Sequence, residues 1–182
     1  MNQALVDAIT AHVPVLETER LRLRAHRIDD YDACYATWSD PAVTRFIGGV
    51  PQTTEQVWDR MLRSLGMWGM LGYGYWAVEE KSSGRYVGDV GHADLRRDIE
   101  PSLRGMLEFG WVLAPWAHGQ GYASEAVNAA TSWSREHLPE LNAVCIIAPE
   151  NAPSIRVAEK AGFAKWVDTT YHGSPIGVYR RA

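Results

Sequence analysis

The chain has 182 residues, of which 46% are hydrophobic and 22% are charged, and this composition is typical of one soluble globular domain. The formal net charge of −4 argues against nucleic acid as a partner, and no apolar run approaches the ~18 residues needed to cross a membrane. The N-terminus lacks a basic start followed by an apolar core, so we expect a cytoplasmic protein without a secretory signal.

The first residues predict a lead-in followed by a strand. Residues 1–15 carry little pattern, so we assign the domain proper to residues 16–182. Apolar residues alternate with Arg20, Arg22 and Arg24, which is the period of a strand whose charged face meets water. We therefore expect these arginines to be solvated.

Further signals predict helices and strands in a defined order. Thr53 and Gln56 form a capping box that opens a helix, and residues 66–74 are predicted to form a mobile lid. Gly162 suits a left-handed helix cap. This order predicts a single mixed α/β domain of the α+β class. The predicted elements are strand 16–25, helices 29–38 and 53–65, strands 75–79, 86–90 and 106–113, helix 122–137, strand 144–148, helix 152–161, and strands 165–169 and 177–180.

The cysteines indicate neither a metal centre nor a disulfide. Only Cys34 and Cys145 occur, and neither has cysteine or histidine neighbours at metal-binding spacing. We expect no metal, and we expect both thiols to be buried and inert.

The most informative segment joins a predicted strand to a predicted helix through the loop His118-Gly119-Gln120-Gly121. The first N–H groups of a helix lack intrahelical partners and lie at the positive end of its dipole, so they suit a phosphate. Glycines let the backbone approach phosphate oxygens closely. The chain has no Walker lysine motif, and Ser124 stands where a Rossmann fingerprint has its third glycine. By itself, the loop leaves an ordinary glycine turn equally open.

Two motifs make the interpretation specific. The run from His118 to Ala123 resembles the Arg/Gln-x-x-Gly-x-Gly/Ala signature of the GNAT acetyltransferase superfamily. The run from Asn151 to Phe163 is similar to the Asn-x-x-Ser … Glu-Lys-x-Gly-Phe segment of its RimJ/RimL branch. The resemblance implies a GNAT-like central twisted mixed sheet flanked by helices, with acetyl-CoA (coenzyme A) as cofactor. It assigns cofactor contacts to Val112, Leu113, His118, Gly119, Gln120, Gly121, Tyr122, Ala123 and Asn151.

Two residues depart from the pattern of the superfamily. His118 stands where arginine or glutamine is usual, which is tolerable if the backbone N–H makes the contact. Ala158 stands where many members carry a tyrosine that protonates the leaving thiolate, so the resemblance moves this role to Ser154. Ser154 is equally suited to capping the helix, and Asn151 can combine a capping role with a cofactor contact.

Amine acetylation also needs a group that removes a proton, because alkyl ammonium ions are almost wholly protonated at pH 7. Glu108 lies in the strand that leads into the glycine loop and matches a position that is often acidic in the superfamily, so it is the candidate base. Alternation does not decide which face of the sheet it occupies, and a surface glutamate is the competing interpretation. Glu125, in the first turn of a predicted helix, is interpreted as structural.

The expected reaction is direct attack of a primary amine on the thioester, with a backbone N–H near Leu113 stabilising the carbonyl oxygen. The acceptor is a protein N-terminal amine or a small-molecule amine, and a homodimer is compatible with the sequence. The competing function is a noncatalytic acyl-CoA sensor, suggested by the absence of a tyrosine at Ala158. Aromatic candidates for an acceptor groove are Trp38, Phe46, Trp68, Tyr73 and Tyr75.

Overall fold

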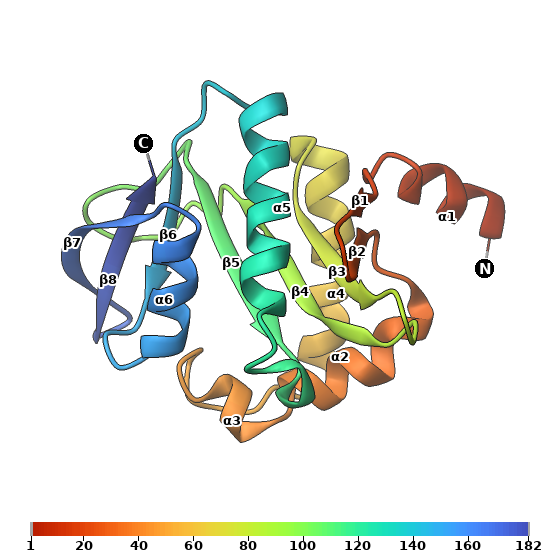
Figure 1. The fold of residues 1–182 in the computed structure, drawn as a ribbon, viewed down its shortest axis with the longest axis horizontal. Coiled ribbons are helices and arrows are strands. Elements are labelled where there is room, and N and C mark those ends of the chain that lie inside the picture. Colours follow the sequence, from red (N-terminus) through yellow and green to blue (C-terminus); the bar gives the residue numbers. More distant parts are fainter. Residues whose placement is uncertain (1, 182) are drawn as a thin grey trace.

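The computed structural model describes residues 2–181, and within them eight strands form one open sheet (Figure 1). Their order is β1-β2-β3-β4-β5-β6-β8-β7, and every neighbouring pair is antiparallel except β5 and β6. The predicted mixed α/β fold is confirmed. The strands are β1 (Leu16–Glu17), β2 (Leu21–Arg24), β3 (Tyr75–Glu80), β4 (Tyr86–Ala93), β5 (Leu107–Leu113), β6 (Ala143–Ile147), β7 (Ala164–Tyr171) and β8 (Ser174–Arg181).

Helices cover both faces of this sheet. In Figure 1, α5 and α6 cross the near face, and α2 and α4 lie behind the sheet. The buried residues of α5 include Ala126, Ala130 and Ser134, whose spacing of four places them on one helical face. The α-helices are α1 (Gln3–Thr10), α2 (Tyr31–Trp38), α3 (Pro41–Thr44), α4 (Thr54–Leu71), α5 (Tyr122–His137) and α6 (Ala152–Lys160), and the 3₁₀ helices are η1 (Ile28–Asp30) and η2 (Pro115–Ala117).

The N-terminal region contains more regular structure than its sequence pattern indicates. The lead-in includes α1, an amphipathic helix that has no buried residues. The strand predicted over residues 16–25 is instead β1 and β2, joined by a turn in which the Thr18 N–H donates to the Leu21 carbonyl at 2.9 Å. The four polar residues 17–20 interrupt the apolar alternation at this reversal.

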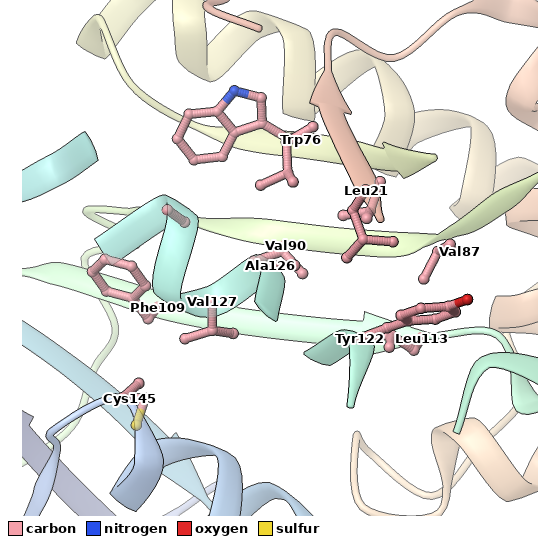
Figure 2. Packing of buried hydrophobic residues seen from close by; sticks show 14 of the residues in the cluster. Leu21, Trp76, Val87, Val90, Phe109, Leu113, Tyr122, Ala126, Val127 and Cys145 are labelled. Carbon is pink, nitrogen blue, oxygen red and sulfur yellow. The ribbon is translucent and has the colours of Figure 1, made fainter. Parts of the chain in front are cut away.

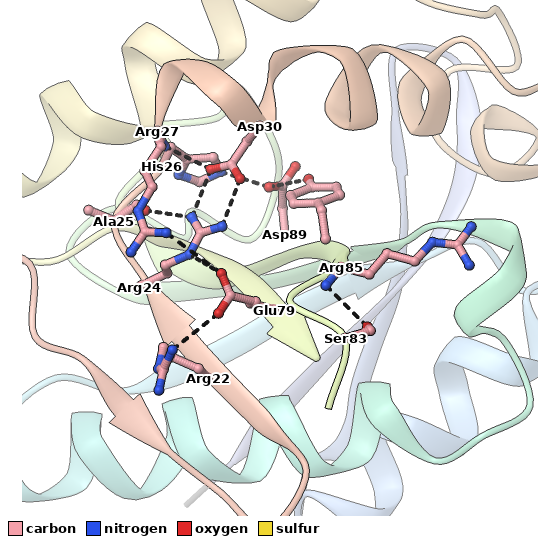
Figure 3. A network of polar contacts seen from close by, with 11 residues as sticks. Arg22, Arg24, Ala25, His26, Arg27, Asp30, Glu79, Ser83, Arg85 and Asp89 are labelled. Atoms are coloured by element: carbon pink, nitrogen blue, oxygen red, sulfur yellow. Dashed lines mark hydrogen bonds and ion pairs between the residues drawn. The ribbon is translucent and has the colours of Figure 1, made fainter. Parts of the chain in front are cut away.

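The prediction that Arg20, Arg22 and Arg24 share a solvated face is wrong for Arg24. Its side chain is only 6% exposed, and its guanidinium pairs with Asp30 at 2.7 Å and with Glu79 at 2.8 Å (Figure 3). These carboxylates replace the hydrogen bonds that water would supply, so the sheet tolerates a buried charge here.

The helix opened by the capping box of Thr53 and Gln56 is confirmed, but it extends to Leu71. It ends at Gly72, whose φ of +75° is a left-handed C-terminal cap. The predicted mobile lid over residues 66–74 is therefore wrong, because most of this stretch is the end of α4.

The main hydrophobic core lies between the sheet and α5 (Figure 2). Val90 of β4 and Val127 of α5 are fully buried, and each such side chain stabilises the fold by about 1.5–3 kcal/mol. Cys34 and Cys145 are buried and unpaired, as predicted. Burial raises the pKa of both thiols, which keeps them protonated and unreactive.

Candidate active site

The strands β5 and β6 run side by side over only a short distance and then part (Figure 1). Within residues 2–181, their paired residues are Leu107 with Ala143 and Glu108 with Val144. Beyond this point β5 stays paired with β4, and β6 stays paired with β8. The facing edges of β5 and β6 therefore form an opening in the middle of the sheet, which we call the fork.

The backbone of β5 presents polar groups to this fork. The N–H of Leu107 donates to Asn142 on the β6 side at 2.9 Å, whereas the N–H of Ala114 donates to Val87 on the β4 side at 2.8 Å. Backbone groups alternate between the two sides of a strand, and the pairing of β5 with β4 has no register shift. The residues whose N–H groups face the fork are therefore Phe109, Trp111 and Leu113.

The glycine loop lies where β5 ends and leads through η2 into α5. Gly119 has a φ of +75° and Gly121 a φ of +82°, a conformation that other residues rarely adopt. Gly121 is the N-cap of α5, and no side chain caps this helix. The first N–H groups of α5, including those of Tyr122 and Ala123, are therefore available to an anion.

The polar side chains of this loop turn back onto the loop itself. His118 Nε2 lies 2.9 Å from the Leu113 carbonyl oxygen, and Gln120 Nε2 donates to the Trp116 carbonyl at 2.7 Å. Because both side chains are engaged, the backbone is what the loop offers to a ligand. Histidine in place of arginine or glutamine is compatible with this arrangement.

The start of α5 is held by Arg20 from the turn between β1 and β2. Its guanidinium pairs with Glu125 at 2.6 Å and donates to the Gln120 carbonyl at 2.9 Å, and Thr18 donates to the same carboxylate. Burial opposes the charge of Glu125, but the hydrogen bonds from Thr18 and Arg20 outweigh it and lower its pKa. Glu125 is therefore a structural residue, in agreement with the prediction.

On the other side of the fork, two polar residues lie at the start of α6, one as its N-cap and one in its first turn. Asn151 is its N-cap, and its side-chain oxygen accepts the Ser154 N–H at 3.3 Å. Ala158 lies one turn after Ser154 on the same helical face and is fully buried. Ser154 is therefore the hydroxyl that this face of α6 presents to the cavity described next.

A cavity of about 940 Å³ passes through the fork. Its wall includes β5, β6, Asn151 and Ser154 on one side, and α4 with the loop after α3 on the other. The turn between β7 and β8 closes a further part of the wall. The cavity thus connects the α6 side of the sheet with the α4 side, and it lies within the ~300–1,000 Å³ range of small-molecule sites.

The register between β4 and β5 decides which face Glu108 occupies. Glu108 lies opposite Ala93, and Val112 lies opposite Asp89. Cross-strand partners share a face of the sheet, and side chains alternate along each strand, so all four point the same way. Asp89 bonds Trp38 of α2, which identifies this face as the α2 and α4 side. Glu108 is 4% exposed and lines the cavity, so the interpretation as a surface glutamate is wrong.

Arg97 binds Glu108 inside the cavity. Its Nε lies 2.8 Å and 2.7 Å from the two carboxylate oxygens, and its third contact is from Nη2 to Oε1 at 2.7 Å. Burial opposes the charge of Arg97, but the hydrogen bonds to Glu108 outweigh it and raise its pKa. The carboxylate is therefore held in place, and any proton that it accepts must compete with this cation.

Gly110 makes room for Tyr75 in the same wall. A Cβ at Gly110 would lie 2.6 Å from the Tyr75 hydroxyl oxygen, closer than real atoms approach. Burial raises the pKa of Tyr75, so its hydroxyl remains neutral at pH 7 and can donate a hydrogen bond.

Asp89 is a second buried carboxylate of the cavity wall (Figure 3). It lies 2.7 Å from His26 Nε2, and it accepts from Trp38 at 2.9 Å and from Tyr86 at 2.7 Å. Burial opposes its charge, but these hydrogen bonds outweigh it and lower its pKa. With three partners already in place, Asp89 anchors α2 to β4 and is a poor candidate for a base.

The five aromatic residues predicted to form an acceptor groove fall into two sets. Trp38 and Phe46, with Tyr75, line the cavity. Trp68 and Tyr73 pack in the main core instead. Of the five predicted aromatic residues, only those of the first set line the cavity.

Three cavity residues that the sequence motifs did not indicate carry the charges closest to the candidate base and acceptor: Arg60, Asp89 and Arg97. An aspartate inside an otherwise apolar strand is a signal that could have identified Asp89, because such a residue needs buried partners. Arg60 lies on an amphipathic helix and Arg97 in a polar connection, where arginines are ordinarily exposed. Only the tertiary structure brings these two into the cavity.

Among residues 2–181, no group of three or more histidine, cysteine, aspartate or glutamate side chains is arranged to hold a metal ion. In the same part of the chain, no helix combines the length and apolarity needed to cross a membrane.

Comparison with known proteins identifies a family, a relative in sequence and a similar structure. The Acetyltransferase (GNAT) domain family matches residues 20–164. The chain belongs to the GNAT acetyltransferase family. This GNAT chain is 31% identical to the uncharacterized protein YkkB of Bacillus subtilis (strain 168) over 173 residues, covering 91% of this chain and 94% of YkkB. A putative GNAT-family acetyltransferase from Bordetella pertussis has a similar structure, with a TM-score of 0.81 at 28% identity, covering 93% and 99% of the two chains.

A more distant structural match is RimL, whose name is that of the branch that the sequence motifs resemble. RimL, a ribosomal alpha-N-protein acetyltransferase solved in complex with coenzyme A, aligns with a TM-score of 0.74 at 15% identity, over 92% of this chain and 97% of RimL. At that identity the likeness shows a shared GNAT fold and no more. The predictions of a GNAT fold and of an acyltransferase are confirmed, and the sensor alternative is not favoured.

Proposed function

We propose that this GNAT enzyme transfers an acetyl group from acetyl-CoA to a primary amine, within a domain formed by residues 16–182. The fork carries the proposal, because its open β5 edge ends at an uncapped helix N-terminus with two left-handed glycines. Amide groups pair with an open strand edge, and a pyrophosphate suits a helix start. Coenzyme A contains both groups in one elongated molecule, and the complex of RimL with coenzyme A supports the choice.

Two sets of residues would hold coenzyme A. The backbone of residues 118–123 would bind the pyrophosphate, with Arg20 keeping the start of α5 in place. The edge groups of Trp111 and Leu113 would bind the amide-containing arm, with Val112 in the cavity wall and Asn151 at the facing end of α6.

Bound acetyl-CoA supplies an acetyl group activated for attack by an amine. Leu113 lies at the glycine-loop end of β5, away from Glu108, so the expected donor to the thioester carbonyl shifts along the strand. The N–H of Phe109 faces the fork beside Glu108 and would donate to that oxygen, whose negative charge grows during attack. The acceptor amine approaches from the α4 side, where Trp38 and Tyr75 line the cavity. This arrangement needs no covalent enzyme intermediate.

Glu108 accepts the proton of the amine, directly or through a water molecule. It is the last β5 residue paired with β6, so it lies at the closed end of the fork. Asp89, the other buried carboxylate of the wall, is already committed to three partners. Arg97 is a positioning residue, because it acts by fixing the carboxylate of Glu108.

Ser154 returns a proton to the leaving thiolate. It lies in the first turn of α6 and lines the cavity, whereas Ala158 offers no donor. The Asn151 to Phe163 run that contains Ser154 also supports placing the chain in the RimJ/RimL-like branch. The acceptor classes consistent with this are a protein N-terminal amine and a small-molecule amine.

The proposal is tested by release of free thiol from acetyl-CoA in the presence of a panel of peptides and small amines. We expect release that depends on the amine, together with a mass increase of one acetyl group on the acceptor. Binding of acetyl-CoA with no release for any amine would instead identify a sensor.

A further inference from the structure

Arg60 of α4 is a cation on the acceptor side of the cavity with unused hydrogen-bond donors. Its Nε donates to Gln52 at 3.1 Å, and its guanidinium carbon lies 3.6 Å from the centroid of the Trp38 ring. Within residues 2–181 its terminal nitrogens have no hydrogen-bond or ion-pair partner, yet they are not sealed from solvent. Since Arg60 lines the cavity, these nitrogens are open to a ligand there.

Neither buried carboxylate of the cavity forms an ion pair with Arg60 in the described part of the chain. Asp89 is held by His26 and two neutral donors, and Glu108 is paired with Arg97. Glu150 also lines the cavity, but it is exposed to solvent, where its charge is screened. The oxygens of both buried carboxylates are therefore engaged by other groups, and Asp89 attracts the Arg60 charge only from a distance.

Two further arginines extend the positive surface. Arg45 and Arg63 line the same side of the cavity, and neither forms an ion pair with any residue in the described part of the chain. Arg63 lies one turn after Arg60 on α4, so their side chains share a helical face. The acceptor side thus carries unbalanced positive charge.

The environment of Arg60 also prepares it for an anion. Burial lowers its pKa, which shows that its charge lacks full solvation where it lies. The stacking on Trp38 and the bond to Gln52 fix the plane of the guanidinium. A carboxylate could then bind the terminal nitrogens with two parallel hydrogen bonds and little loss of side-chain entropy.

We propose that the acceptor is an amine that also carries a carboxylate, and that Arg60 binds this carboxylate while the amine points toward Glu108. The inference rests on the proposed acetyl transfer and names its substrate class. It argues against polyamines and aminoglycosides, whose additional positive charges would meet Arg45, Arg60 and Arg63.

The test compares acceptors that differ only in the carboxylate. The panel contains α-, β- and γ-amino acids with their carboxamides, peptides with an acidic or a neutral second residue, and spermidine. For the wild type we expect kcat/KM to be at least about 10-fold higher for the best carboxylate acceptor than for its amide. If the acidic peptides exceed the free amino acids, the carboxylate comes from a peptide side chain, which supports the same chemistry.

Variants of Arg60 identify the residue responsible. Arg60→Gln should lower kcat/KM for the carboxylate acceptor about 10- to 100-fold, mainly through KM, and should change the amide less than about 2-fold. Arg60→Lys keeps the charge without the planar guanidinium, so its kcat/KM for the carboxylate acceptor should lie between those of the wild type and Arg60→Gln. Arg180→Gln is the matched control, because Arg180 also stacks on a tryptophan, Trp166, but lies outside the cavity.

Two results would overturn the inference. One is a wild type that uses amides or spermidine as well as carboxylates, and the other is an Arg60→Gln variant that loses both members of a pair equally while its melting temperature falls. The second result would make Arg60 a structural support of Trp38. Failure of the proposed function is distinguishable, because then no acceptor releases thiol with the wild type.

Discussion

The guanidinium Nε of Arg97 lies within 2.8 Å of both carboxylate oxygens of Glu108, at the closed end of the fork. Arg97 follows β4 and Glu108 is the second residue of β5, so the pair also ties the connection between these strands to the sheet. Removing either partner leaves the other charge without its ion pair, at a cost below the ~3–5 kcal/mol of a fully buried pair because the Arg97 side chain is 24% exposed. Any test of Glu108 in catalysis must therefore be separated from its effect on stability.

Glu108→Gln should lower kcat by about 10² to 10⁴, the usual contribution of a general base. The loss should shrink as pH rises, because more of the acceptor amine then arrives already neutral. The measurement is kcat from pH 6 to 9, with the KM for acetyl-CoA as a check that the cofactor still binds.

Arg97→Gln is the companion to that variant. It breaks the same ion pair but keeps the carboxylate, so we expect a similar fall in melting temperature and a smaller fall in kcat. If both variants lose activity equally, or if Glu108→Gln stays within a few-fold of wild type at every pH, Glu108 is structural and water removes the proton.

Gly121→Val should weaken cofactor binding. Its φ of +82° is unfavourable for a branched residue, and the new Cβ would lie 3.4 Å from Nη2 of Arg20, which holds the loop. We expect the KM for acetyl-CoA to rise by at least about 10-fold, in line with a cost of 1–3 kcal/mol for backbone strain. Gly84→Val is the control, since Gly84 has a φ of +70° and open space but lies in the turn between β3 and β4. Equal KM values for both variants would remove the loop from the site.

Acetyl-CoA should raise the melting temperature, because a ligand that binds only the native state stabilises it. At 100 times its Kd the ligand adds about 2.7 kcal/mol, which for a chain of this size corresponds to a shift of roughly 5–10 °C. Differential scanning fluorimetry with acetyl-CoA and with adenosine would measure this. The absence of any shift at millimolar acetyl-CoA would contradict the assigned cofactor.

Ser154→Ala should slow the chemical step without weakening the N-cap. The cap uses the side chain of Asn151 and the backbone N–H of Ser154, and both remain in the variant. We expect kcat to fall by about 10²-fold if Ser154 is the proton donor, with little change in melting temperature. Ser124→Ala, a serine of the first turn of α5, serves as the control. An unchanged kcat would indicate that water protonates the thiolate.

His92 should make the protein sensitive to acid. It is fully buried, neither ring nitrogen has a partner among the described residues, and burial lowers its pKa to about 3. Between the unfolded pKa of 6.5 and this value the unfolded chain binds the extra proton, so stability falls as pH falls, by up to about 1.4 kcal/mol per pH unit.

His92→Leu removes the group that titrates and puts a leucine side chain of similar volume in place of the ring. The free energy of unfolding, measured with urea, should therefore differ between variant and wild type by a constant amount above pH 7. Below pH 6.5 the difference should grow in favour of the variant. Parallel curves down to pH 4 would show that His92 is solvated or bonded in solution.

Local structure was largely readable from the sequence. The helix at residues 122–137 agrees with α5 at both ends, because a strong apolar stripe lies between a glycine and a proline. The left-handed cap at Gly162 and the capping box of Thr53 are also present as predicted. The glycine loop and its place between a strand and a helix were evident for the same reason: each depends on residues close together in the chain.

The composition of the cavity depended on tertiary structure. Alternation along β5 allowed Glu108 to face either way, and only its register with β4 places it on the α4 side. Arg97 and Arg60 reach the same cavity from a connection and a helix that no local pattern links to β5. Arg24 likewise reads as an exposed strand residue until Asp30 and Glu79 are brought around it. Backbone conformation follows from neighbours in sequence, whereas the burial and pairing of a charge follow from contacts between distant segments, which form only when the sheet assembles.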